Sequence, residues 1–406
     1  MNFRFLHAAD LHLGSPLQGL AQKDEGVARR LASASRAAFE DLVTKALEEN
    51  VAFAVIAGDV FDGDWKDASI GLFFNRQLAR LSNRSVSTYF LRGNHDAESV
   101  VTKSLPWPHK VVEFSTRRPE THRIEAVRVA LHGRGFPKRD VGENYALDYP
   151  APIPGWFNIG VLHTACGRTG HENYAPCTPA DLAARGYDYW ALGHVHAFEI
   201  VSRDPWIIYP GNLQGRSVRE CGERGAVIVE VAGARVMDVR RVLTDRARWA
   251  EVVIDAGEHG DEQGLLDAVE AAVKPHAERA EERLLAVRVT LAGAARLNAR
   301  WLADPDLRDR VEAAAQRCSE DVWLERLRIA TSEPRREAGG AALVELDIAA
   351  SLDACAADPD LRARLMEAIG TVKAKLPGGM REDPVAALDI ESILAAARAL
   401  TLGRAA

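Results

Sequence analysis

Aspartate, asparagine and histidine residues gather in five short segments of the chain. Asp10-Leu11-His12 and His194-Val195-His196 each place two polar side chains two residues apart. In an extended segment such side chains point the same way, so both can approach one metal ion or two neighbouring ions. The other three segments are Gly58-Asp59-Val60-Phe61-Asp62, Gly93-Asn94-His95-Asp96 and the single His163.

The donor atoms of these segments form a mixed oxygen and nitrogen set. Carboxylate, amide and imidazole ligands suit manganese, iron or zinc, and they suit a calcium cage poorly. Asp59 follows a glycine at the end of a predicted strand, where one carboxylate can bridge two ions. Two ions about 3.5–4 Å apart can hold a hydroxide and a phosphate between them. The segments therefore predict a two-metal site.

Each segment alone is weak evidence for such a site. A single D-x-H or H-x-H usually binds no metal, and G-N-H-D is also typical of a turn, because Gly and Asn tolerate left-handed backbone conformations. All five segments directly follow a predicted strand, and strand ends of an α/β sheet share one edge where ligands bind. Seven other histidines are expected in the core or on the surface: His7, His109, His122, His132, His171, His259 and His276.

Strands and helices alternate up to about residue 240, which is typical of an α/β domain. Residues 25–50 predict a long amphipathic helix. The runs 206–209, 226–231 and 236–243 lack intervening helices and predict antiparallel sheet. Strands before them are expected at residues 3–8, 52–57, 88–91, 127–131, 157–162 and 189–192.

The pattern predicts a first domain at residues 1–245 and three further parts. Residues 246–332 run strand, helix, strand, helices, strand, and predict a small α+β domain. The polar, glycine-containing stretch 333–342 predicts a linker. Residues 343–406 predict a helical region.

Two helices are expected in that C-terminal region, starting near Pro359 and Pro384. The related segments ADPDLRDR and ADPDLRAR predict Asp304 and Asp358 as helix N-caps. The apolar residues of the last helix can pack on the chain's own domain or on a partner. These residues are Val385, Leu388, Ile393, Leu394 and Leu400.

Composition narrows the class of protein. With 406 residues, 47% hydrophobic and 27% charged, the chain is neither disordered, collagenous nor a membrane protein. A net charge of -7 argues against a surface that binds nucleic acid everywhere, but not against a local basic groove. Five cysteines without a C-x-x-C pair indicate no disulfide framework, and we expect a reducing cytoplasm. No targeting segment or membrane contact is expected.

The order D-x-H, G-D-x-x-D, G-N-H-D, H, G-H-x-H resembles the calcineurin-like metallophosphoesterase superfamily. Within it, HAADLHLGSPL, VIAGDVFD and FLRGNHDAES resemble the SbcD-type DNA-repair exonuclease subunits. The resemblance covers residues 1–240 strongly and the remainder only in its general layout. It implies an α/β metallophosphoesterase sandwich of mixed sheets flanked by helices, with a small α+β capping domain and a C-terminal helical tail.

The resemblance also implies two divalent metal ions, most often Mn²⁺, with Mg²⁺, Fe²⁺ or Zn²⁺ as alternatives. The first ion would be held by Asp10, His12, Asp59 and His196. The second would be held by Asp59, Asn94, His163 and His194.

The remaining motif residues would act on the phosphate. The resemblance implies that His95 contacts the scissile phosphate and assists the leaving oxygen, and that Asp62 orients His95. Elementary chemistry agrees, because a carboxylate hydrogen-bonded to an imidazole fixes its tautomer and favours its protonated form.

Basic residues near the motifs can contact DNA phosphates or can be ordinary solvated charges. They are Arg92, Arg134, Lys138, Arg139, Arg216 and Arg219. The resemblance implies DNA as substrate and an SMC-like ATPase subunit as partner, docked through the C-terminal helices, and it allows a homodimer.

Three functions therefore compete. The leading hypothesis is a metal-dependent DNA exonuclease or endonuclease in DNA repair, the nuclease subunit of a complex with an SMC-like ATPase. The alternatives are a small-molecule phosphodiesterase or nucleotide pyrophosphatase with the same metal pair, and a non-catalytic scaffold subunit. A protein serine/threonine phosphatase is disfavoured, because G-D-x-x-D continues as Gly63-Asp64 rather than Arg-Gly.

Overall fold

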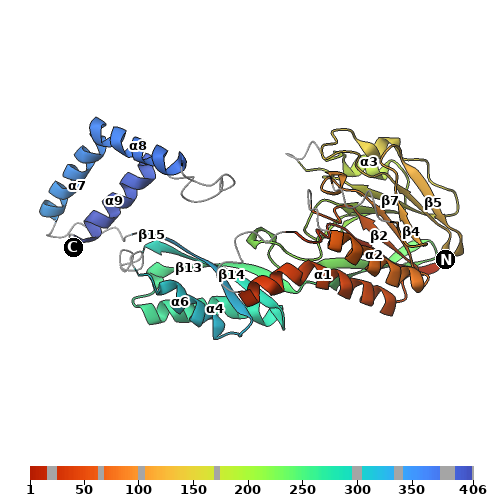
Figure 1. The fold of residues 1–406 in the computed structure, drawn as a ribbon, viewed down its shortest axis with the longest axis horizontal. Coiled ribbons are helices and arrows are strands. Elements are labelled where there is room, and N and C mark those ends of the chain that lie inside the picture. The colour runs from red at the N-terminus through yellow and green to blue at the C-terminus, as the bar shows by residue number, and fades with distance from the viewer. Residues whose placement is uncertain are drawn as a thin grey trace. The chain divides into compact units, whose positions relative to one another are not determined.

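Two compact units make up the chain in the computed structural model (Figure 1). The first contains residues 1–251, 276–287 and 320–325, and the second contains residues 252–275, 288–319 and 326–406. The structure describes residues 1–15, 25–62, 68–98, 106–168, 174–294, 304–332, 342–374 and 389–404.

A six-stranded sheet in the first unit carries the N-terminal strand at its centre. Its order is β12-β11-β1-β2-β3-β4. Strands β1 to β4 run parallel, and β11 pairs antiparallel with both β1 and β12. The bounds are β1 Asn2–Ala8, β2 Phe53–Ala57, β3 Ser87–Leu91, β4 Val111–Glu113, β11 Gly225–Ala232 and β12 Arg235–Leu243.

The second six-stranded sheet has the order β5-β6-β7-β8-β10-β9. Strands β6, β7, β8 and β10 are parallel, and the two edge strands β5 and β9 pair antiparallel. Of the three runs expected to form antiparallel sheet, β11 and β12 pair antiparallel with each other. The strand at 206–209 does not join them, because β10 lies in this second sheet, antiparallel to β9 and parallel to β8. The bounds are β5 Glu120–Ile124, β6 Val129–Gly133, β7 Phe157–His163, β8 Tyr189–Gly193, β9 Glu199–Arg203 and β10 Trp206–Tyr209.

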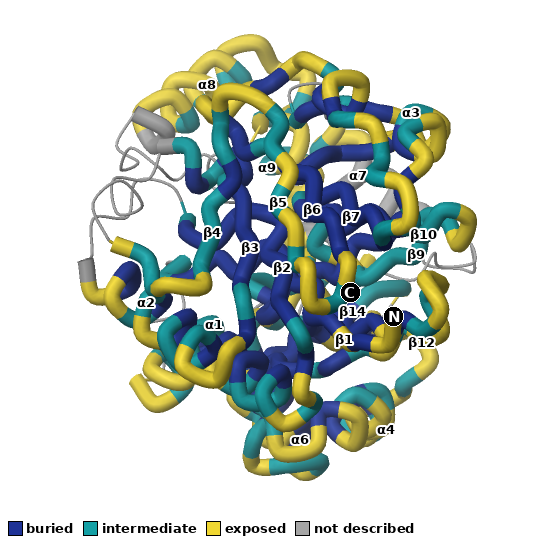
Figure 2. Tube along the Cα trace, turned by 90° about the vertical axis from the view of Figure 1, so that its right-hand side faces the viewer, coloured by how far each residue is buried: buried dark blue, intermediate teal, exposed yellow. Residues whose placement is uncertain are grey.

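The two sheets pack face to face around an apolar core. Strand β2 shows how side chains are distributed, because successive residues of a strand point to opposite faces. Phe53 and Val55 join the core between the sheets, whereas Ala54 and Ile56 join the cluster under the helices. The ring of Phe53 stacks on Phe5 with centroids 5.1 Å apart. Strands β2, β3, β6 and β7 are accordingly buried along most of their length (Figure 2).

Helices cover the outer faces of both sheets. Helices α1 (Glu25–Glu48) and α2 (Ala68–Asn83) bury Leu42 and Phe74 against the first sheet. On the second sheet, Trp190 packs among residues of α3 (Pro179–Ala183) and of the loops before it. The expected fold class, mixed sheets flanked by helices, is confirmed.

A third sheet has three strands in the order β13-β14-β15. The strands are β13 (Ala247–Asp255), β14 (Leu284–Ala294) and β15 (Val322–Ser332), with α4 (Glu262–Ala280) and α6 (Leu307–Gln316) between them in sequence. This order of elements agrees with the expected α+β pattern. The domain boundaries at residues 245 and 332 stay predictions.

Three C-terminal helices pack on one another. They are α7 (Ala342–Ala357), α8 (Pro359–Ala374) and α9 (Ile390–Arg404). The start at Pro359 is confirmed, whereas α7 was not expected as a separate helix. The linker expected at 333–342 lies outside the described residues except for Ala342, which begins α7. The expected start at Pro384, with Val385 and Leu388, also lies outside them.

Among the described residues, no helix is both long and apolar enough to span a bilayer.

Candidate metal centre

The five motif segments meet at the ends of strands from both large sheets. Asp10 and His12 follow β1, and their backbone N–H groups donate to the carbonyls of Gly58 (3.0 Å) and Asp59 (3.0 Å) after β2. His163 is the last residue of β7. The expected convergence is thus present, but it involves the ends of strands from two sheets rather than strand ends of a single sheet.

Glycine precedes a motif side chain in three of the segments because neighbouring atoms of the site lie too close to leave room for a Cβ. A Cβ on Gly58 would lie 2.5 Å from Nδ1 of His163. A Cβ on Gly93 would collide with the Asp59 carboxylate, and one on Gly193 with the carbonyl oxygen of Ala57. These glycines are therefore part of the site, since they let the strand ends come together.

Four polar residues of the site hold unusual backbone conformations. The φ angles are 52° at Asp10, 43° at His12, 52° at Asp59 and 100° at His194. A non-glycine residue with positive φ costs on the order of 1–3 kcal/mol, and such residues concentrate at functional sites. The packing that holds these loops must offset that cost.

Asp10, His12 and His196 form a first group of donors. Their ligand atoms lie within 4.8 Å of one another. Nε2 of His12 faces Nε2 of His196 at 3.2 Å, and Nε2 of His196 lies 4.0 Å from Oδ1 of Asp10. Burial lowers the pKa of His12 to about 4, so its ring is neutral at pH 7 and able to bind a metal.

Asp59 and His163 form a second group, together with Asp10. Oδ2 of Asp59 lies 3.4 Å from Nε2 of His163 and 3.9 Å from Nε2 of His12, so this carboxylate lies between the two groups. Its other oxygen accepts from the backbone N–H of His95 at 3.0 Å. Oδ1 of Asn94 lies 2.9 Å from Nε2 of His163.

His194, the remaining expected ligand, lies at the edge of this second group. Its ring centroid is 5.3 Å from that of His163, and Tyr174 stacks on it at 4.6 Å. Its backbone N–H donates to both carboxylate oxygens of Asp10, at 3.0 and 3.1 Å.

The electrostatics of the cluster fit a bound cation. Asp10 and Asp59 are both buried, and an uncompensated buried charge is costly. Burial raises the pKa of Asp10 to about 6. Burial alone would lower the pKa of His163, but the Asp59 carboxylate outweighs it and raises this pKa to about 9. The cluster thus attracts a proton where a metal ion would supply the same positive charge, and its oxygen and nitrogen donors suit a transition metal.

His95 and Asp62 lie beside the donor groups as a hydrogen-bonded pair. Nδ1 of His95 is 2.8 Å from Oδ1 of Asp62, and Ser15 donates to Oδ2 of Asp62 at 2.6 Å. The hydrogen bond between His95 and Asp62 raises the pKa of His95 against the opposing effect of burial. Burial would raise the pKa of Asp62, but the His12 and His95 rings hold it well below its ordinary value. The imidazole is 31% exposed, so a substrate can reach it.

Asp96, the last residue of G-N-H-D, fixes two of the loops. Its buried carboxylate accepts from the backbone N–H groups of Val60 (3.1 Å), Phe61 (2.8 Å) and Gly93 (3.0 Å). The segment that carries Asp59 is thereby tied to the segment that carries Asn94.

Sequence reasoning missed a carboxylate, Glu220, and considered Arg216 only as a DNA contact or an ordinary solvated charge. Oε1 of Glu220 lies 2.7 Å from Nδ1 of His196, and Arg216 lies 3.1 Å from the same oxygen. The other motif segments lie within a few residues of a strand end, whereas Glu220 lies well beyond Tyr209, the last residue of β10, so the same signal does not mark it.

The other expected DNA contacts lie outside the donor groups. Arg92 pairs with Glu113 at 2.5 Å, and the Arg134 guanidinium lies 3.8 Å above the ring of Tyr145. Arg219 is exposed in the short helix Val218–Glu220.

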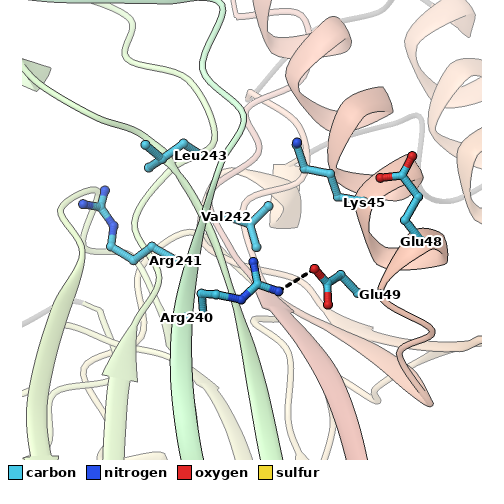
Figure 3. Close-up of a pocket in the computed structure, with 7 residues that line it drawn as sticks. All are labelled: Lys45, Glu48, Glu49, Arg240, Arg241, Val242 and Leu243. Atoms are coloured by element: carbon cyan, nitrogen blue, oxygen red, sulfur yellow. Dashed lines mark ion pairs between the residues drawn. The ribbon is translucent and has the colours of Figure 1, made fainter. Parts of the chain in front are cut away.

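A pocket of about 210 Å³ between α1 and β12 contains none of the expected site residues (Figure 3). Its arginines are paired: Arg240 with Glu49 at 2.6 Å and Arg241 with Glu223 at 3.0 Å. The pocket therefore offers no evident anion site.

Comparisons with known proteins agree with this geometry. Residues 3–198 match the family model described as calcineurin-like phosphoesterase, and residues 249–332 match the middle domain of metallophosphoesterase YhaO. The chain is 35% identical over 271 residues to the uncharacterized metallophosphoesterase YhaO of Bacillus subtilis (strain 168), which covers 66% of each chain. It is 28% identical over 293 residues to the DNA double-strand break repair protein Mre11 of Methanopyrus kandleri, covering 64% of this chain and 61% of that protein.

The chain thus spans slightly less than two thirds of the length of these curated relatives. Among solved structures, TT1561 of Thermus thermophilus is similar with a TM-score of 0.36 and 13% identity, over 59% of this chain and 99% of that one.

Proposed function

The chain belongs to the calcineurin-like phosphoesterase family through residues 3–198, and from this premise we propose that it is a two-metal phosphodiesterase that cleaves DNA. Metal-dependent hydrolysis of phosphoesters is the activity of the family. The observation that carries the two-metal assignment is the place of Asp59, whose Oδ2 lies between His12 and His163. Asp10, His12, Asp59 and His196 would hold one ion, and Asp59, Asn94, His163 and His194 the other.

The ions, when bound, would supply Lewis-acid activation of water and neutralise the phosphate charge. His95 would contribute proton transfer from the chain itself. Nδ1–H of His95 donates to Asp62, so the protonated ring carries its second proton at Nε2, where it is available for the leaving oxygen. Asp62, held by Ser15, would keep the ring in this orientation.

The proposal of DNA as substrate rests on similarity to a protein whose name describes double-strand break repair. We further propose that the protein acts in DNA repair and is located in the cytoplasm. Its C-terminal helices would bind an SMC-like ATPase partner, and the proposal allows a homodimer. Met366 and Leu400 are exposed on those helices, at 64% and 42%. The structure describes all five cysteines and joins none of them in a disulfide, which fits a reducing compartment. Mn²⁺ is the ion we expect.

A small-molecule phosphodiesterase or nucleotide pyrophosphatase is the second candidate. One observation favours it: Arg92 and Arg216 are engaged by carboxylates of the chain itself, so they are not free to bind a DNA backbone. A non-catalytic scaffold is disfavoured, since the expected ligands and the His95–Asp62 pair lie together.

One panel of substrates separates these functions. The purified chain would be incubated with Mn²⁺ and bis-p-nitrophenyl phosphate, cyclic nucleotides, nucleotide pyrophosphates, or single- and double-stranded DNA ends, with and without chelator. Chelator-sensitive cleavage of DNA supports the proposal. Cleavage of small substrates only supports the second candidate. Bound metal with no hydrolysis of any substrate would support the scaffold.

A further inference from the structure

A carboxylate outside the five motif segments contacts one of the expected metal ligands. Glu220 ends the short helix Val218–Glu220, which lies between β10 and β11 in sequence. Its Oε1 lies 2.7 Å from Nδ1 of His196. A hydrogen bond at one ring nitrogen determines which nitrogen is free for a metal. Here it leaves Nε2 of His196 free, facing His12 and Asp10.

Glu220 is itself held by several donors. Its Oε2 accepts from Nδ2 of Asn212 at 2.9 Å and from the backbone N–H of Arg216 at 2.8 Å. Its Oε1 also accepts from Nη2 of Arg216 at 3.1 Å. The side chain is only 13% exposed. Burying a carboxylate is costly unless it is fully hydrogen-bonded, so this group is fixed in place by the loop around it.

Arg216 extends the arrangement toward the other half of the site. Its Nη1 lies 3.5 Å from Oδ2 of Asp62, the partner of His95, and its Nη2 lies 3.3 Å from Nδ1 of His196. The loop after β10 therefore contacts a donor of the first group through Glu220 and the His95–Asp62 pair through Arg216.

We propose that Glu220 is a positioning residue that fixes the ring of His196 with Nε2 toward the ion of the first group. The inference rests on the proposed two-metal function. Glu220 contacts His196 and none of Asp59, Asn94 or His163, so its effect falls on one of the two ions. A role limited to loop stability would not distinguish between the ions.

The test is Mn²⁺ binding by the full chain, measured by calorimetric titration after removal of metal. Outer partners of metal ligands are typically worth about 10- to 100-fold in affinity. We expect the wild type to bind two ions, and Glu220→Ala to bind one of them about 10- to 100-fold more weakly and the other normally. Glu220→Gln should show a smaller loss, because its amide oxygen can still accept from His196. Excess Mn²⁺ should restore the turnover of both variants.

The matched control is Glu223→Gln, three residues away, whose side chain is 45% exposed and pairs with Arg241. This variant should bind both ions like the wild type. The inference would be overturned, with the proposed function intact, if Glu220→Ala bound both ions with wild-type affinity. It would also be overturned if Glu220→Gln bound both ions equally more weakly while its circular dichroism spectrum stayed unchanged. If Glu220→Ala fails to fold, the Gln variant decides. A wild type that binds no Mn²⁺ would overturn the proposed function and the inference with it.

Discussion

Asp59 is the residue on which both donor groups depend. Its Oδ1 accepts a hydrogen bond from the backbone N–H of His95. Its Oδ2 lies between His12 and His163. Burial favours the neutral acid, but the charge and hydrogen bond of His163 outweigh it and keep the pKa of Asp59 well below its ordinary value. The carboxylate is therefore ionised at neutral pH.

Asp59→Asn should lose at least one metal ion per chain, because an amide supplies one neutral oxygen in place of a bridging carboxylate. The measurement is metal content by mass spectrometry after gel filtration. Asp238→Asn, at an exposed position of β12, serves as control and should keep both ions. Full occupancy together with undiminished hydrolysis in Asp59→Asn would show that the bridge is misassigned.

His95→Gln should keep both metals but lower kcat by roughly 10²- to 10⁴-fold, the usual size of a general acid or base contribution. His109→Gln, at an exposed position, should change neither quantity. Loss of metal from His95→Gln would instead identify His95 as a ligand.

Asp62→Asn should give a weaker defect in kcat with a changed pH profile. The Asp62 hydrogen bond raises the pKa of His95, so the wild type keeps the protonated acid to higher pH and loses activity as pH rises through that raised pKa. The variant lacks the carboxylate charge, so the alkaline limb of its profile should lie at lower pH. An alkaline limb that stays in place would argue that His95 is not the titrating acid.

At the scale of elements, close contact between strand ends explains why the site needs glycine at fixed places. Gly193 ends β8 where it meets the end of β2, and a Cβ there would collide with the carbonyl oxygen of Ala57. Neither strand can move away without separating Asp59 from His163.

Gly193→Ala should lower the free energy of unfolding by about 1–3 kcal/mol, the usual cost of overpacking. Urea denaturation measures the change. Gly260→Ala is the matched control, since a Cβ there would meet no described atom within 4 Å. Equal urea midpoints for the two variants would mean that β2 and β8 can separate without cost.

The elements also show what the sequence could and could not predict. Motif residues came together as expected, because each lies at or just after the end of a strand. The sequence did not predict that these strands belong to two sheets rather than one. Helix starts were harder: Asp358 caps α8, accepting from the N–H groups of Asp360 and Leu361. Asp304 has nearly the same sequence around it and accepts from the N–H of Asp306 at 2.9 Å, but it also pairs with Arg310, and α6 begins only at Leu307. Arg310 also pairs with Glu262 of α4, a distant partner that the local sequence does not contain.

Glu220 and Arg216 illustrate the same limit within the site. Glu220 is separated from His196 by strands β9 and β10, and their contact depends on how the loop after β10 folds back. A spacing pattern cannot show such a contact.

At the scale of the whole molecule, the C-terminal helices are the expected partner-binding element. A chain that ends near Ser332 should keep its metals and basal hydrolysis, because every expected ligand lies before residue 200. It should no longer bind an SMC-like ATPase. Co-purification with that ATPase, compared with the full chain, is the measurement. Equal affinity of the two chains would exclude α7, α8 and α9 as the docking element.

The central place of β1 has a consequence for synthesis of the protein. Asn2 pairs with Ala232, so the first strand made must wait for β11 before both its edges are covered. At about 5–20 residues per second, translation leaves that edge open for on the order of 10–50 s. A ribosome-arrested chain that ends before Gly225 should therefore be digested rapidly by protease and should depend on chaperones. Asp10 and His12 are thus the first expected ligands to be translated, yet they follow the ligand-bearing strand that gains its second neighbour last.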